Sequence, residues 1–333
     1  MKTLIKFLIF STISMCIFNQ NLHASGKIKI GLIIPLSGDN YLIGERIIKS
    51  IRIAINKIND ENVEIIPRDT KSNPIDALKV SKELHAEGVR IIIGPVFNES
   101  TKYLDDLNDV TFISFTNKLI GNPKNVISAG VNAISQLQTI KKFNEKNNLS
   151  KSIFLIPKSQ FKKEIEVAIN KTNIRHKEVF YYDREPTKLT KQIEDLTKYR
   201  IRKNNLEEEI KRLEKLSFKD KETKIENLKR RDTLGSINFD SVVIADFDEN
   251  LKSVATSLLY TDISPKRVYY ITLNQWFDES LLKENSLHPI YFPSINKSNY
   301  ELFMNDFKNA YGLDGDQLSF LSYDLIGLVY FLI

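Results

Sequence analysis

Residues 27–39 read KIKIGLIIPLSGD, an apolar run of strand length that leads into a turn. Residues 43–58 follow with isoleucines and an alanine at helical spacing, which indicates a strand–turn–helix unit. Strands that alternate with helices, and β-branched runs buried on both faces, predict a parallel sheet in an α/β fold. Beyond this first unit we predict strands at 63–67, 89–94 and 110–114, and helices at 74–87 and 100–107.

A second series of the same kind begins at residue 136. It has a helix at 136–144 and strands at 152–156, 178–182, 241–245 and 267–271. A chain of 333 residues is long enough for two cores, so we predict two doubly wound parallel-sheet lobes. Extended stretches at 125–128 and 288–293 would carry the chain between them. Lobe one would then comprise residues 27–134 plus 289–333, and lobe two residues 135–288.

The first 24 residues have the order of a secretory signal peptide. A basic start is followed by an apolar run at 7–18 and by a small residue, Ala24. We predict a signal peptide at 1–24, cleavage after Ala24 and a periplasmic location, with an uncut membrane anchor as the alternative. Lipid attachment at Cys16 is a further alternative that we favour less, because Met15 stands where a lipoprotein signal has a small residue.

Cys16 is the only cysteine, so cleavage would leave a chain without thiols. Such a chain can form no disulfide and can use no thiol in catalysis or metal binding. Residues after the leader include no other run of 18 or more apolar residues, so we expect no transmembrane span in the mature chain. Residues 321–333 stop within an apolar helical pattern, and we expect Ile333 to be the end of a fragment rather than a natural terminus.

One segment, residues 186–235, interrupts the alternation of strands and helices. It is polar and helical with a thin apolar stripe, and we predict a coiled-coil hairpin spanning about 190–230 with a bend near 217–221. The segment carries 15 basic and 10 acidic residues, which accounts for most of the formal net charge of +6. It is either a solvated helical pair or a docking surface for an acidic partner or the anionic envelope. The candidate partner-binding residues are Lys211, Arg212, Lys215, Lys224 and Arg230; nucleic acid is not an expected partner of an exported protein.

Motifs of the common enzyme classes are absent from the sequence. It contains no Walker-type phosphate loop, no dinucleotide glycine motif, no G-x-S-x-G and no H-E-x-x-H. The stretch that starts at Asp246 resembles a calcium loop only in part, since Leu251 and Ser257 occupy positions that require glycine and glutamate. We therefore predict a protein that is not an enzyme and that needs no cofactor or metal.

Residues 30–38 (IGLIIPLSG), together with Ile93-Gly94-Pro95 and Ile113-Ser114, resemble the type 1 periplasmic binding fold of leucine-binding proteins. That resemblance implies two lobes that close by a hinge motion on a small ligand. A closer resemblance is to the penicillin-binding-protein activator branch of the same fold. It lies in Pro67-Arg68-Asp69-Thr70, in 94–97 (GPVF), 113–117 (ISFTN) and 231–235 (RDTLG). Members of that branch stimulate peptidoglycan synthases by direct contact.

The resemblance places a ligand-binding cleft at residues that follow strands. The candidate cleft residues are Ser37, Asn98, Ser114, Phe115, Thr116, Asp246, Asn274 and Trp276. Two departures argue against free amino acids: bulky Phe115 stands where a small residue is usual, and the loop containing Asn274 lacks the acid that would bind an ammonium group. Ordinary packing is the alternative role for Phe115 and Trp276.

Two functions follow from these observations. The first is an envelope protein that activates a peptidoglycan synthase by protein contact. The alternative is a substrate-binding protein of an ABC transporter for amino acids or another small polar ligand. An enzyme on a similar scaffold is the third and least favoured reading, because a fold alone does not imply activity.

Overall fold

The structure is a computed structural model that describes residues 27–118, 120–274, 281 and 283–333. The predicted signal peptide, Cys16 and Trp276 lie outside these residues. The described chain forms two compact units. The first comprises residues 27–115, 123–127 and 322–333, and the second comprises 116–122 and 128–321.

The first unit is built on a five-stranded sheet in the order β2-β1-β3-β4-β5. Strand β1 (Ile28–Ile34) lies between β2 (Val63–Asp69) and β3 (Ile91–Ile93), and both pairings are parallel. Strand β4 (Thr111–Ser114) continues the parallel arrangement, and β5 (Val126–Ser128) completes the sheet. Ile30, Leu32, Ile33 and Ile34 of β1 are almost completely buried, as expected of a central strand covered on both faces.

Two α-helices of the first unit are those predicted, α2 (Tyr41–Ile58) and α3 (Pro74–Ala86). Asn73 caps α3 by accepting hydrogen bonds from the backbone N–H groups of Ile75 and Asp76, and Pro74 occupies the first turn. The helix predicted at 100–107 is wrong. That region forms two short 3-10 turns, η1 (Asn98–Thr101) and η2 (Leu104–Asp106).

The second unit contains a fully parallel sheet in the order β10-β9-β8-β6-β7. Its strands are β6 (Ser152–Pro157), β7 (Glu178–Tyr182), β8 (Ser241–Ile244), β9 (Tyr269–Thr272) and β10 (Ile290–Tyr291). The prediction of two parallel-sheet α/β lobes is therefore confirmed.

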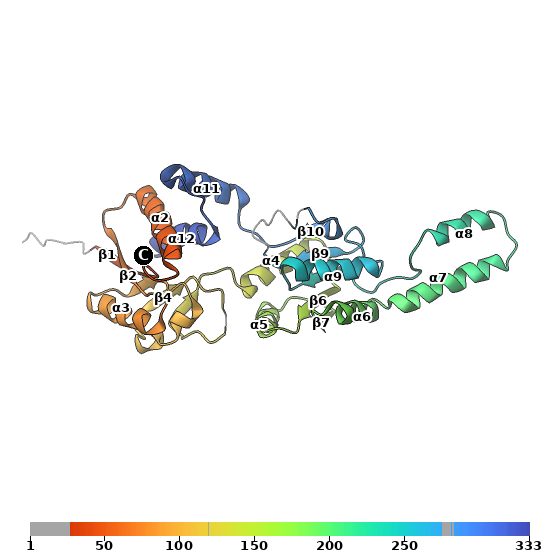
Figure 1. Ribbon diagram of the computed structural model, residues 1–333, viewed down its shortest axis with the longest axis horizontal. Coiled ribbons are helices and arrows are strands. Elements are labelled where there is room, and N and C mark those ends of the chain that lie inside the picture. Colours follow the sequence, from red (N-terminus) through yellow and green to blue (C-terminus); the bar gives the residue numbers. More distant parts are fainter. Residues whose placement is uncertain (1–26, 119, 275–280, 282) are drawn as a thin grey trace, which may run out of the picture. The chain divides into compact units, whose positions relative to one another are not determined.

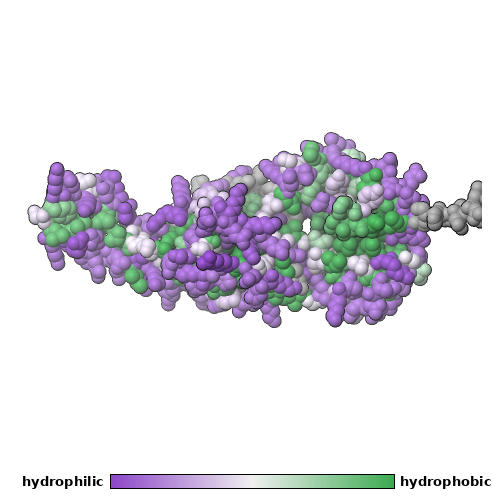
Figure 2. All heavy atoms as spheres, turned by 180° about the vertical axis from the view of Figure 1, so that it is seen from behind, coloured by the Kyte–Doolittle hydropathy of each residue, from purple (hydrophilic) through white to green (hydrophobic). Residues whose placement is uncertain are grey.

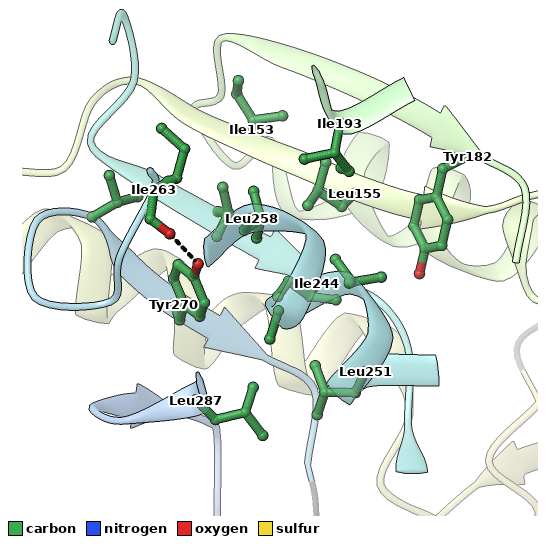
Figure 3. Packing of buried hydrophobic residues seen from close by; sticks show 14 of the residues in the cluster. Ile153, Leu155, Tyr182, Ile193, Ile244, Leu251, Leu258, Ile263, Tyr270 and Leu287 are labelled. Carbon is green, nitrogen blue, oxygen red and sulfur yellow. Dashed lines mark hydrogen bonds between the residues drawn. The ribbon is translucent and has the colours of Figure 1, made fainter. Parts of the chain in front are cut away.

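Strand β6 shows how the second sheet is covered on both faces. Ile153 and Leu155 face a core shared with helices α6 (Pro186–Leu196) and α9 (Asp248–Tyr260) (Figure 3). Phe154 and Ile156 face the opposite core, which is formed with α4 (Ala133–Lys146) and α5 (Lys162–Thr172). The period of two along a strand separates these side chains into two layers.

The segment from 186 to 235 is not a single structural element. Its first helix, α6, belongs to the core of the second unit, where Leu189 and Ile193 are 1% and 0% exposed. The next two helices, α7 (Tyr199–Glu214) and α8 (Lys221–Lys229), contact each other and are joined by residues 215–220 (Figure 1). The prediction that the hairpin begins near residue 190 is therefore wrong, because residues 190–196 belong to α6, which packs against the second sheet.

The chain returns to the first unit later than expected. Strand β10 pairs with β9, and helix α11 (Lys297–Tyr311) also belongs to the second unit. From residue 322 onward, α12 (Gln317–Leu332) belongs to the first unit, where the Tyr330 hydroxyl donates to Asp60 over 3.0 Å. The boundary of lobe one predicted at 289 differs from this division because strand pairing keeps residues 290–291 in the second sheet.

Candidate functional site

Asp246 follows strand β8 at the carboxyl end of the second sheet, and its carboxylate is already occupied. The side chain is 1% exposed. The Tyr182 hydroxyl donates to Oδ2 over 2.7 Å, and Arg184 donates from Nη2 to Oδ1 over 2.8 Å and from Nε to Oδ2 over 3.1 Å. Burial, and next the adjacent carboxylate, raise the pKa of Tyr182 well above its usual range. The hydroxyl therefore stays protonated and donates to Asp246.

This bidentate pair limits what Asp246 can do for a ligand. Arg184 lies two residues after β7 and supplies the cation within the chain itself. A ligand ammonium could pair with Asp246 only by displacing the Arg184 guanidinium. Displacement would leave the positive charge of Arg184 without its carboxylate partner. The predicted cleft residue Asp246 therefore bonds to Tyr182 and Arg184 within the protein itself.

A cavity lies at the same end of the second sheet, and we call it the carboxyl-end cavity. Its volume is about 230 Å³. The lining residues follow β8 and β9 or come from the first turns of α4 and α5 and from the 116–122 segment: Asn117, Lys118, Val131, Asn132, Ala133, Gln136, Phe161, Glu164, Ile165, Ala245, Phe247 and Leu273. Lys118 Nζ lies 5.5 Å from the centre of the Phe161 ring. None of these residues was among the predicted cleft residues.

The predicted residue Asn274 lies beside this cavity. Its backbone N–H donates to the Gln136 side-chain oxygen over 2.8 Å, and its side chain is buried. Gln136 therefore links helix α4 to the loop after β9. The signal for Gln136 in the sequence was its position in the first turn of the helix that opens the second series of strands and helices.

In the first unit, the predicted cleft residues Ser37 and Ser114 form hydrogen bonds with neighbouring parts of the same unit. Ser37 donates to Asp69 Oδ2 over 2.5 Å, and the Leu36 N–H donates to Oδ1 over 2.8 Å. Burial raises the pKa of Asp69, but the bonds from Ser37, Leu36 and Lys71 outweigh it and hold the pKa below its usual value. Asp69 at the end of β2 thus holds the turn after β1 in place.

The residues after β3 and β4 show a second local network. The Ser114 hydroxyl and the Phe115 N–H both donate to the Pro95 carbonyl, over 2.7 and 3.2 Å. Phe115 is 6% exposed, which supports the packing role that we considered for it. Within the described residues, the buried Oδ1 of Asn98 has no hydrogen-bond partner.

Ser37, Asn98, Ser114 and Phe115 lie in the first unit, whereas Thr116, Asp246 and Asn274 lie in the second. The Thr116 hydroxyl accepts a hydrogen bond from the Lys118 N–H over 3.2 Å. A common ligand site for all seven residues therefore stays a prediction.

The predicted partner-binding residues are exposed on α7 and α8 or directly after these helices, but not all of them are without partners. Arg212 forms two bonds with Glu209, and Arg230 pairs with Glu226 over 2.7 Å. Lys224 Nζ lies 5.5 Å from the ring centre of Phe218. Figure 2 shows hydrophilic residues over most of the visible face of these helices, with a hydrophobic patch among them. The surface is mixed in charge. Of the five predicted partner-binding residues, Lys211 and Lys215 have no side-chain partner among the described residues.

The base of this hairpin is held by a buried arginine. Arg202 is 3% exposed and donates to the Thr197 carbonyl over 2.9 Å, to the Thr233 hydroxyl over 2.7 Å and to the Thr261 carbonyl over 2.5 Å. Asp262 accepts a bond from Thr233 and lies 3.9 Å from Arg202. One side chain thus joins α7, the segment after α8 and the end of α9.

Comparison with known proteins identifies the architecture. A family model described as periplasmic binding protein matches residues 27–172. A solved structure described as a putative branched-chain amino acid ABC transporter from Rhodospirillum rubrum is 11% identical with a TM-score of 0.65, covering 92% of this chain and 84% of that chain. The chain has the type 1 periplasmic-binding-protein fold.

Another solved structure with this fold is the C-domain of LpoA from Haemophilus influenzae, described as a regulator of PBP1A. It is 12% identical with a TM-score of 0.58, and the alignment covers 91% of this chain and 86% of the domain. The search of curated proteins found no match. The two solved structures share the fold of this chain, and one is described as a transporter while the other is described as a regulator.

The described part of the chain shows neither a metal-binding cluster nor a membrane-spanning helix. No group of three or more His, Cys, Asp or Glu side chains there is arranged to hold a metal ion. No helix among the described residues is both long and apolar enough to span a membrane.

Proposed function

We propose that this chain is a non-enzymatic periplasmic protein that regulates a peptidoglycan synthase by direct contact. The observation that carries the proposal is the α7–α8 hairpin. It adds nothing to either sheet, and its apolar residues Leu206, Leu213 and Ile225 are buried within it. A protein that only carries a solute needs no such element, whereas a regulator needs an accessible surface that is held at a fixed place.

The bonds at the base of the hairpin support this role. Because Arg202 joins three segments of the second unit, the hairpin is anchored at its base. An anchored element loses less conformational entropy on binding than a flexible loop does. The occupied carboxylate of Asp246 supports the proposal in a second way, since an amino-acid carrier needs a free acid for the ligand ammonium.

The proposal is tested by reconstitution with a purified peptidoglycan synthase and its lipid-linked disaccharide substrate. The chain should raise the rate of glycan polymerisation. Replacement of residues 205–229 by a short Gly-Ser linker retains Arg202 and Thr233, and it should remove the stimulation while leaving the thermal midpoint of the core unchanged. Equal stimulation by the trimmed and full-length proteins would exclude the hairpin as the contact surface.

A matched pair of charge reversals refines this test. Lys211 and Lys215 lie four positions apart in the last turn and at the C-cap of α7, Lys142 and Lys146 are spaced likewise on α4, and all four are exposed. The variant Lys211→Glu/Lys215→Glu should weaken synthase binding, whereas Lys142→Glu/Lys146→Glu should not. The loss should grow smaller at high salt, because exposed charges are screened beyond about 10 Å at 0.1 M.

The second candidate function is delivery of a small polar ligand to a transporter. The carboxyl-end cavity favours it, because in open α/β sheets ligands bind outside the carboxyl ends of the strands. A ligand that binds there should shift the amide resonances of Ala245, Phe247 and Leu273. Such shifts without any stimulation of a synthase would favour the carrier.

A further inference from the structure

A larger cavity lies at the opposite, amino-terminal end of the second sheet, and we call it the amino-end cavity. Its volume is about 480 Å³, within the range typical of small-molecule sites. It lies between the C-terminal ends of α4 and α5 and the residues that lead into β6 and β7. The lining residues are Lys141, Asn144, Glu145, Asn148, Leu149, Ser150, Asn173, Ile174 and Arg175.

Most polar side chains of this cavity are not engaged within the protein. Among the described residues, the side chains of Glu145, Asn148, Ser150, Asn173 and Arg175 have no hydrogen-bond or ion-pair partner. Lys141 differs, because its Nζ donates to the Thr172 carbonyl at the end of α5 over 3.1 Å. These five side chains supply both hydrogen-bond donors and acceptors. Three of them are neutral: the amides of Asn148 and Asn173 and the hydroxyl of Ser150.

These groups define the chemistry that the cavity can recognise. An anion would satisfy only the donors and a cation only the acceptors. Glu145 and Arg175 are exposed, so water screens their attraction for ions. A ligand hydroxyl both donates and accepts, and several hydroxyls would satisfy the amides, Ser150 and the two charged groups together.

The cavity also has an apolar wall. Ile174 is 3% exposed and belongs to the core beneath α4 and α5, and Leu149 packs against the same core. Such a wall suits the C–H face of a sugar ring, while the hydroxyls at the ring edge reach the polar groups. We propose that the amino-end cavity is a binding site for a neutral, hydroxyl-rich ligand of the saccharide class. This site is separate from the hairpin and does not depend on the function proposed above.

Backbone geometry supplies variants that remove polar groups without strain. Asn148 and Asn173 have φ values of 56° and 48°, in the left-handed region that glycine adopts freely. Asn148→Gly and Asn173→Gly therefore delete the two amides while keeping the backbone. Asn59 ends α2 in the first unit with a φ of 51°, so Asn59→Gly is a matched control far from the cavity in sequence and in a different unit.

The experiment titrates the full-length protein with the N-acetylglucosamine disaccharide and with maltose, and follows amide resonances. Binding should shift the signals of Ser150 and Ile174. Asn148→Gly and Asn173→Gly should each weaken binding about five-fold, the value expected for one lost neutral hydrogen bond, and Asn59→Gly should not. Three outcomes would overturn the proposal. They are the absence of any shift at millimolar concentrations of both sugars, shifts confined to residues that line the carboxyl-end cavity, and tighter binding of glutamate than of either sugar.

Discussion

The Arg202 guanidinium donates to the Thr233 hydroxyl over 2.7 Å, and this bond closes the base of the α7–α8 hairpin. The two residues are separated by nearly the whole hairpin. Gly235 lies against the same arginine: a Cβ there would stand 3.4 Å from Arg202 Cγ, and the φ of 134° is one that side chains rarely adopt. Thr233 and Gly235 thus both lie against a buried arginine that precedes them by about 30 positions in the sequence.

The first prediction concerns Arg202. Arg202→Met should lower the free energy of unfolding by about 2–4 kcal/mol, because it leaves the Thr197 and Thr261 carbonyls and the Thr233 hydroxyl without their buried donor. Urea denaturation measures the change. Arg200→Met is the control, since Arg200 is an exposed neighbour in the same turn, and its effect should stay below about 0.5 kcal/mol. Equal effects of the two substitutions would contradict the role assigned to Arg202.

The second prediction compares two deletions of the hairpin. Removal of residues 200–228 takes Arg202 away and should destabilise the second unit, whereas removal of 205–229 keeps Arg202, Thr233 and their bonds. We therefore expect a lower thermal midpoint only for the longer deletion. If both deletions melt at the temperature of the full-length protein, the bonds of Arg202 do not stabilise the unit.

The third prediction concerns the pair of Arg184 and Asp246. Arg184→Met should destabilise the protein by about 2 kcal/mol, because it leaves a buried carboxylate without its cation; the value is reduced because Arg184 is about one-third exposed. The double variant Arg184→Met/Asp246→Asn should recover part of the loss. If the double variant lost more unfolding free energy than the two single variants lose together, the two residues would not be coupled in this way.

The fourth prediction concerns the amino acids leucine, isoleucine and valine. None should bind with micromolar or tighter affinity by calorimetry, because Asp246 is paired with Arg184 and Phe115 is packed in its own unit. Tight binding of any of the three would restore the amino-acid carrier and weaken the proposed regulatory function.

The fifth prediction concerns pH. The pKa of Asp69 is lower in the folded protein than its reference value of 3.8. Its hydrogen bonds therefore add stability that is fully present above about pH 3.8 and is lost as the pH falls through the lower, folded pKa. Asp69→Asn should make the unfolding free energy less dependent on pH in this acid range.

The parallel sheets could be predicted from sequence because the signal is local. Runs such as 28–34 and 152–157 are apolar over the length of a strand and are followed by helical periodicity, so the alternation of elements is visible without knowledge of any partner. The cores confirm the pattern, with alternate residues of β6 in two separate layers.

Periodicity could not decide which helix belongs to which layer. α6 and α7 have similar polar sequences, yet Leu189 and Ile193 are buried against the second sheet while α7 packs against α8. The choice depends on which apolar stripe meets the sheet, and that meeting is set by residues distant in the sequence.

By itself, then, the sequence determined the alternation of strands and helices, the two parallel sheets and the polar helical segment, because each depends on the order and spacing of neighbouring residues. Only the tertiary structure decided that Asp246 is occupied by Arg184, that Arg202 reaches Thr233 and Thr261, and that two cavities lie at opposite ends of one sheet. These contacts join residues separated by about 30 to 60 positions, and no local spacing predicts them. Whether a polar side chain is free for a ligand depends on such distant partners, because a buried charge or donor is paired wherever the fold brings a complementary group within reach.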